Sequence, residues 1–192
     1  MSARTGLANP LLKLRALTNA GTADYAVGTI HYWSDDQLQI ILDAHRTDVY
    51  RELTQAQPIP DSGTALYFDY YTQPGDDGHA YEEGTAFKVA DSVGGTVSPT
   101  INYQEGHLSF GTVDQRGTAY FLTARRFDLN AAAADVWRQK MAQVAMAYSF
   151  TADGQSLSRN QMIQQCKTMA ELYDSLSQPV RVQMVRGDSG CL

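Results

Sequence analysis

A short stretch in the first quarter of the chain contains its clearest helix signal, and it reads Ser34-Asp35-Asp36-Gln37-Leu38. A serine followed three residues later by a glutamine is the capping-box pattern, and the aspartates between them complement the helix dipole. Apolar residues continue at helical spacing as far as Leu53, until Gln57-Pro58-Ile59-Pro60 breaks the pattern. The sequence therefore predicts an amphipathic helix of about five turns that begins at Ser34.

Three further segments have helical character. Residues 9–17 place Asn before Pro and carry regularly spaced leucines, and residues 128–148 place capping residues before four alanines. Residues 158–176 repeat the capping-box spacing ahead of an apolar face. Pro179 ends this last helix, and the alternation of residues 180–185 predicts a short strand in an extended tail.

Between the second and third predicted helices the composition changes to that of strands and turns. From residue 65 to about 124, segments rich in Tyr, Phe, Val and Thr are separated by Gly, Asp, Ser and Pro. Residues 101–110 alternate on both sides of a Glu-Gly turn, which predicts a β-hairpin. Helices thus flank the strands and do not alternate with them, which is typical of an α+β fold.

We therefore expect, in chain order, two helices, a small antiparallel β insertion between the second and third helices, two further helices and an extended C-terminal tail. The predicted parts are residues 1–60 (N-terminal helices of the core), 61–126 (β insertion), 127–178 (C-terminal helices of the core) and 179–192 (extended C-terminal arm).

Composition narrows the classes of function. A net charge of -6 and a pI near 5.1 argue against a protein that binds nucleic-acid phosphates, because that affinity comes largely from clustered Lys and Arg. No stretch has the apolar length of a membrane span, so we expect no membrane contact. The two cysteines, Cys166 and Cys191, are too few for a disulfide framework, which fits a reducing compartment such as a cytoplasm.

The sequence offers little support for catalysis. It lacks a phosphate-binding Gly-rich motif and a Gly-x-Ser-x-Gly elbow, and its four histidines are isolated from one another and from cysteine. We therefore expect no enzyme activity, no cofactor and no metal. The acids Asp76, Asp77, Glu82 and Glu83 are interpreted as a solvated loop, and Cys166 as a core residue on the apolar face of its helix.

Three segments together resemble the head-tail connector (adaptor) proteins of tailed bacteriophages, of the siphophage type: residues 17–25, 32–38 and 128–137. The likeness covers the order of elements from about Asn9 to Leu176. Membership would imply a fold with a four-helix connector core and a β insertion. It would also imply a structural virion protein at the neck, the head-tail junction, which is present in the host cytoplasm during assembly. It would imply a dodecameric ring that joins the portal protein to a tail-terminator or other neck protein and lets genomic DNA pass without specific binding.

The resemblance further implies that the C-terminal region docks to the portal. An extended segment with alternating apolar residues can add a strand to an exposed sheet edge. The residues that we expect to bind the portal are Val180, Arg181, Val182, Met184, Val185 and Arg186.

The sequence is also compatible with other functions. A tail-terminator or head-completion protein of the same neck would also be acidic, of mixed α and β structure and ring-forming. A β-type recognition module, for example for carbohydrate, is motivated by four tyrosines near the acidic loop, Tyr67, Tyr70, Tyr71 and Tyr81. An enzyme would have only the acidic cluster to support it.

Overall fold

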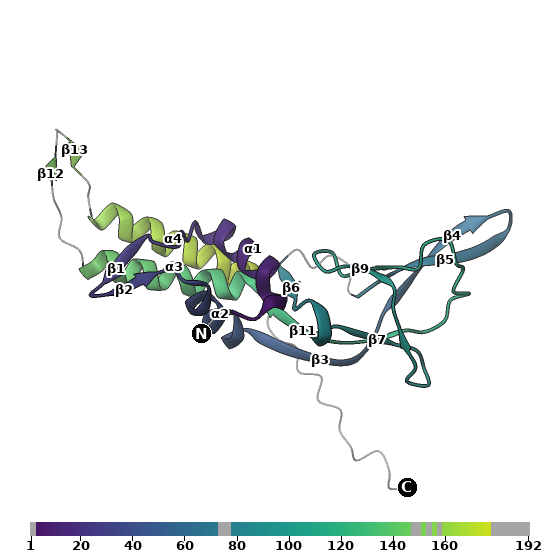
Figure 1. The fold of residues 1–192 in the computed structure, drawn as a ribbon. Coiled ribbons are helices and arrows are strands. Elements are labelled where there is room, and N and C mark those ends of the chain that lie inside the picture. The colour runs from purple at the N-terminus through teal and green to yellow at the C-terminus, as the bar shows by residue number, and fades with distance from the viewer. Residues whose placement is uncertain (1–2, 73–77, 147–150, 153–154, 157–158, 178–192) are drawn as a thin grey trace, which may run out of the picture.

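The protein is elongated, with helices at one end and sheets at the other (Figure 1). The computed structural model describes residues 3–72, 78–146, 151–152, 155–156 and 159–177. We call the two ends the helical module and the β module.

The helical module contains α1 (Ala8–Thr18), α2 (Asp35–Ala44), α3 (Leu129–Met146) and α4 (Arg159–Leu176), with η1 (Thr5–Leu7) before α1 and the hairpin β1 (Tyr25–Val27) and β2 (Ile30–Tyr32) between α1 and α2. A small hairpin, β12 (Thr151–Ala152) and β13 (Gln155–Ser156), lies between α3 and α4. The β module contains β3 (Arg46–Leu53), β4 (Gln55–Asp61), β5 (Thr64–Tyr71), β6 (His79–Tyr81), η2 (Gly84–Ala86), β7 (Lys88–Ala90), β8 (Thr96–Val97), β9 (Thr100–Asn102), β10 (His107–Ser109) and β11 (Phe121–Asp128).

Local capping explains where two of the helices begin. The Ser34 side chain accepts from the backbone N–H of Gln37, and the Gln37 side chain accepts from the backbone N–H of Ser34, so the predicted capping box is confirmed. Asp128 Oδ1 accepts from the backbone N–H of Ala131 at 2.9 Å and caps the start of α3. The predicted cap at Ser158 lies outside the described residues.

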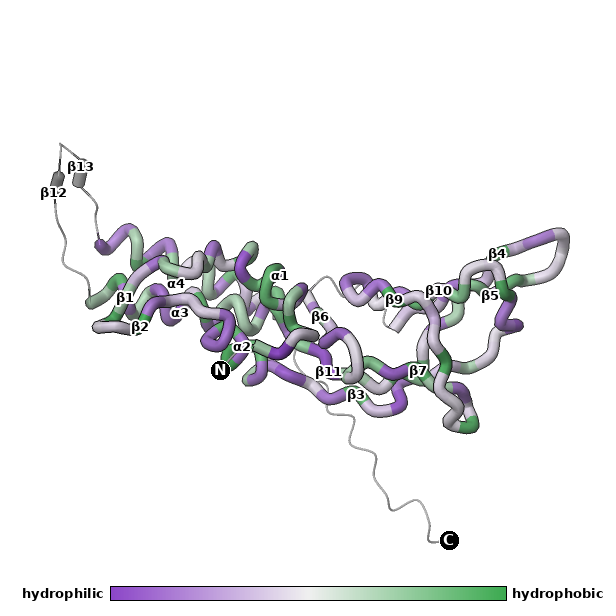
Figure 2. Tube along the Cα trace, viewed as in Figure 1, coloured by the Kyte–Doolittle hydropathy of each residue, from purple (hydrophilic) through white to green (hydrophobic). Residues whose placement is uncertain are grey.

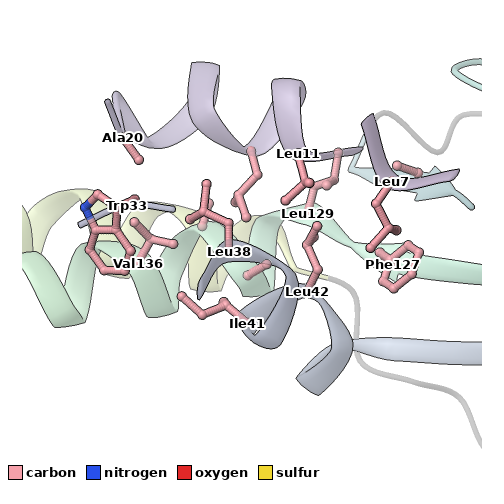
Figure 3. Close-up of a cluster of buried hydrophobic side chains, with 14 residues drawn as sticks. Leu7, Leu11, Ala20, Trp33, Leu38, Ile41, Leu42, Phe127, Leu129 and Val136 are labelled. Carbon is pink, nitrogen blue, oxygen red and sulfur yellow. The ribbon is translucent and has the colours of Figure 1, made fainter. Parts of the chain in front are cut away.

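The core of the helical module is a continuous apolar cluster (Figure 3). Leu11 of α1, Leu38 and Leu42 of α2 and Val136 of α3 meet there, and Trp33 closes the cluster at one end. At the other end Phe127, which is fully buried on β11, extends it toward the sheets. Because β11 continues directly into α3, one unbroken segment links the two modules.

The β module consists of two antiparallel sheets around a second apolar cluster. One sheet has the strand order β4-β5-β10-β9, and the other has the order β3-β11-β7-β8, with β6 pairing with β11 as well. The hairpin predicted over residues 101–110 is confirmed, because Ile101 pairs with Leu108 and Asn102 with His107. Tyr70, Leu108 and Leu122 are buried between the sheets.

The α+β class is correct, but the predicted arrangement of a small β insertion in a four-helix core is wrong. Helix α2 ends at Ala44, and Val49 and Leu53 belong to strand β3, where Val49 pairs with Ala124. The strands therefore occupy most of residues 46–128, the centre of the chain. Pairing along the whole length of β11 outweighs the helical periodicity of this segment, whose β-branched and aromatic residues also suit a strand.

The segment expected to end the helix is itself a strand. Pro58 and Pro60 lie on β4, an outer strand of its sheet, and pair with Tyr67 and Ala65 of β5. Proline is tolerated at such a position because its missing N–H can face solvent. Strands β4 and β5 form a long arm that projects from the β module (Figure 1).

Candidate functional site

The most distinctive polar cluster lies at the junction of the two modules and centres on Glu82. Glu82 directly follows strand β6 in the chain, and its side chain is only 7% exposed. Arg125 of β11 donates from Nη1 to both carboxylate oxygens of Glu82 at 3.3 Å. Arg4, which precedes η1, donates to the same carboxylate from Nε at 3.2 Å and from Nη2 at 3.3 Å. A buried carboxylate thus has two cationic partners.

Arg4 connects this cluster to the helical module. Its guanidinium also binds Asp43 of α2 in bidentate fashion, at 3.0 Å and 2.6 Å. The hydrogen bond with Asp43 is the largest influence on Arg4 and raises the pKa of its guanidinium, against the opposing effect of burial. The resulting chain Asp43–Arg4–Glu82–Arg125 joins α2, the N-terminal segment, the loop after β6 and strand β11.

An open groove runs beside the junction. It is lined by Arg4, Thr5, Gly6, Glu82, Glu83, Gly84, Thr85, Tyr103 and Arg125. Glu83 accepts from Asn9 Nδ2 and donates its backbone N–H to Gly6, which fixes the N-terminal segment against the loop after β6. Arg4, Glu82 and Arg125 in this groove are paired with one another, so the arrangement is suited to holding the modules in a fixed relation.

A second ion-pair chain ties the helices to each other. His45, at the end of α2, contacts Asp135 of α3 at 2.7 Å, and Arg138 of α3 binds both Asp135 and Asp174 of α4. Burial acts to raise the pKa of Asp135, but the bonds from His45 and Arg138 outweigh it and lower the pKa below its usual value. These contacts stabilise the packing of three helices with one another.

The tyrosines considered for a recognition surface do not form one surface. Tyr70 and Tyr81 are buried in the core of the β module, and Tyr67 packs against that core. Tyr71 is partly exposed and stacks on His107, with ring centroids 4.9 Å apart, while His107 contacts Asp69 at 2.9 Å. Tyr71, His107 and Asp69 form a small group that is partly exposed to solvent, and Tyr67 is partly exposed apart from it.

Exposed apolar side chains occur in both modules. Hydrophobic segments are distributed over helices and strands and do not form a single band (Figure 2). In the helical module Leu12 of α1 and Ile40 of α2 point outward, and in the β module Tyr50 of β3 is 81% exposed. Each module therefore has apolar side chains available for contact with another molecule.

The predictions for the acidic residues and for Cys166 compare differently with the structure. Asp76 and Asp77 lie outside the described residues, whereas Glu82 is a buried ion-pair centre, so its interpretation as part of a solvated loop is wrong. Cys166 is buried, as predicted, and burial raises the pKa of its thiol. Among the residues that the structure describes, no three His, Cys, Asp or Glu side chains gather as a metal-ion site would require.

The residues predicted to bind a portal, from Val180 to Arg186, lie outside the described residues, as does the strand predicted there. Within the described ranges, no helix combines the length and the apolar character of a membrane span.

Sequence reasoning missed the junction cluster. Arg4 is separated from Asp43 by 39 positions and from Glu82 by 78, and Arg125 is 43 positions from Glu82. No local spacing links such residues. The pairing of β6 with β11 brings Glu82 beside Arg125, and the bond from the Glu83 N–H to Gly6 brings the segment that contains Arg4 to the same place. The two adjacent glutamates after the strand-like residues 79–81 were the available signal, but they are equally typical of a loop.

Comparisons with family models, with curated proteins and with solved structures each find no match for this chain.

Proposed function

We propose that this chain is a structural virion protein, the head-tail adaptor of a tailed bacteriophage, and works as one subunit of a ring, a dodecamer by resemblance, beneath the portal. The observation that carries the proposal is the division of an elongated molecule into two modules that both expose apolar side chains. A closed ring needs two different, complementary surfaces on each subunit, and a neck protein needs further contacts above and below. A two-module subunit offers such separate surfaces.

The junction cluster supports this proposal on mechanical grounds. A subunit that joins two assemblies must keep its ends in a fixed relation, and the chain Asp43–Arg4–Glu82–Arg125 links the modules where β11 continues into α3. The overall charge of -6 also suits a channel that DNA passes without binding, because an acidic surface repels phosphates.

Negative-stain imaging of the purified protein, alone and mixed with the portal of its phage, tests the proposal. We expect rings of uniform diameter or additional density on the narrow end of the portal. A monomer that leaves the portal bare would contradict the adaptor function.

Two matched variants sharpen this test. A chain that ends at Ser177 removes the expected portal-binding residues, and it should lose portal decoration while keeping the helical core. Leu12→Asp places a charge on an exposed apolar position of α1 without entering the core, so it should reduce ring formation if that face contacts a neighbour. Portal decoration by the shortened chain would refute the role of the C-terminal arm.

Mixing the protein with isolated portal also distinguishes the adaptor from the alternative, a tail-terminator or head-completion protein. Such a protein would bind the tail tube or another neck layer in preference to the isolated portal. A recognition module has one observation in its favour, the solvent-facing Tyr71 stacked on His107 beside Asp69. Binding of a glycan that is abolished by Tyr71→Ala would favour that function.

A further inference from the structure

The outer part of the β4–β5 arm pairs only with itself. Strand β5 pairs with β10 at residues 69–71, and within the described ranges the ribbon of residues 59–66 has no further strand beside it. Ser62 and Gly63 in its turn have φ of +47° and +88°, which is typical of a tight hairpin whose shape is fixed by the turn. A two-stranded ribbon is only marginally stable alone in water, so this arm gains stability from a packing partner.

One face of the arm combines an apolar pair with an acid. Ile59 pairs with Leu66, and Asp61 lies two residues further along β4 on the same face. Ile59 is 40% exposed, and Asp61 is exposed as well. Among the described residues Asp61 accepts a bond from the Ser62 hydroxyl but has no cationic partner. The arm therefore presents apolar side chains followed by a negative charge near its tip.

The outer face of the other sheet contains an apolar row. Leu53, Phe121 and Ala90 lie side by side on three adjacent strands, because Phe121 pairs with both of the others. Side chains alternate along a strand, and the chain neighbours Leu122 and Val89 are buried between the sheets, so the row faces outward. Leu53 is 56% exposed, which leaves the row open to another molecule.

Further apolar side chains and two cations surround this row. Tyr50 of β3 and Val93 of the turn after β7 are 81% and 89% exposed. Arg51 lies over the Phe121 ring, 4.8 Å from its centroid, and Lys88 lies on β7 beside the row. Neither cation has a carboxylate partner among the described residues. The apolar residues of this surface, which we call the sheet patch, are Tyr50, Leu53, Ala90, Val93 and Phe121.

The arm and the sheet patch match in charge and in spacing. Asp61 follows Ile59 by two residues, and Lys88 precedes Ala90 by two residues. Two residues of a strand span about 7 Å, so an apolar contact between Ile59 and Ala90 lets Asp61 reach Lys88. In Figure 1 the arm points away from β3 and β7, so the sheet patch that receives it belongs to another molecule.

From these observations we infer that the arm of one subunit packs on the sheet patch of a second copy of the chain, with Asp61 facing Lys88 and Arg51. Because the two surfaces differ, the contact is heterologous and can repeat around a closed ring. The inference rests on the ring of the proposed function and names the surfaces that close it.

Charge reversal tests this contact in the full chain. Asp61→Lys and Lys88→Glu each bring like charges together, so each should raise the protein concentration needed for assembly about tenfold in analytical ultracentrifugation. The double variant restores opposite charges and should return that concentration close to its original value. The control Glu171→Lys makes the same change of charge on α4, away from both surfaces. A double variant that assembles no better than either single variant would overturn the inference.

Cross-linking identifies the surfaces that meet. In a Cys191→Ser background, a mixture of the Ile59→Cys chain and the Val93→Cys chain should react with a bismaleimide to give a product of dimer mass, while neither chain alone should. Cys166 is buried and does not interfere. A dimer of the Ile59→Cys chain alone would show arms that meet each other, and a link within a chain that carries both cysteines would show an arm on its own patch. Either result would overturn the inference.

Adding the isolated portal separates this inference from the proposed function. Rings on the portal that lack the link between positions 59 and 93 would overturn the inference and leave the adaptor function standing. Linked chains that leave the portal bare would support the inference and contradict the adaptor function. A chain that stays monomeric with and without the portal would overturn both.

Discussion

Replacing Glu82 by glutamine removes the negative charge on which the junction cluster depends. Glutamine keeps the shape of the side chain, but Arg4 and Arg125 then face a neutral amide. Removing one partner of a fully buried ion pair costs about 3–5 kcal/mol. The Arg4 and Arg125 side chains are 33% and 43% exposed, so water screens part of their charge. Arg4 also keeps its bond to Asp43, and we therefore expect a loss of about 2 kcal/mol from the free energy of unfolding.

Urea denaturation followed by circular dichroism measures this loss, and thermal melting should show a decrease of about 4–8 °C in Tm. The control is Asp48→Asn, which breaks the exposed pair between Arg46 and Asp48 and should cost less than about 1 kcal/mol. If Glu82→Gln destabilises the protein no more than Asp48→Asn does, the cluster does not hold the modules together and the reasoning is refuted.

Three further predictions concern the core, a glycine and a tyrosine. Leu42→Ala opens a cavity in the helical core and should cost about 2–5 kcal/mol in urea denaturation, whereas Ile40→Ala on the exposed side of the same helix should cost under about 0.5 kcal/mol. Gly106→Ala should cost about 3 kcal/mol of unfolding free energy, because φ is +62° and the new methyl group meets the Thr72 hydroxyl. The control Gly63→Ala has φ +88° but lies in open space, so it should cost about 1 kcal/mol. Equal losses in the two variants would contradict this packing. Burial raises the pKa of Tyr70 to about 12 in the folded protein, above its ordinary value of 10.0. The folded state holds this proton more tightly than the unfolded chain does. The resulting contribution to stability is complete below pH 10.0 and is lost as pH rises through 12. Absorbance of tyrosinate during an alkaline titration should show a group that ionises near pH 12, and Tyr70→Phe should remove it.

Local signals predicted the starts of elements well. The capping box at Ser34 and the cap at Asp128 depend on residues within three positions of each other, so the sequence alone contains the whole interaction. The hairpin between Ile101 and Leu108 was equally predictable, because its turn and its alternation are adjacent in the chain.

The end of α2 could not be predicted in this way. Val49 and Leu53 match the helical period counted from Leu38, and nothing nearby shows that β11, more than 70 residues later, supplies a pairing partner. The same limit applies to the junction cluster, in which Arg4 and Glu82 are 78 positions apart in the sequence. Contacts between residues far apart in the sequence therefore determine both the extent of the β module and the burial of Glu82.

The two prolines on β4 have a consequence for crowded conditions. An outer strand normally offers its N–H groups to any extended chain that it meets, and many copies of one protein held side by side meet often. Pro58 and Pro60 have no N–H to offer, so two successive bonding positions near the tip of the β4–β5 arm are lost to an incoming strand. The β4 edge of the arm is therefore a poor template for strand addition when copies of the protein collide.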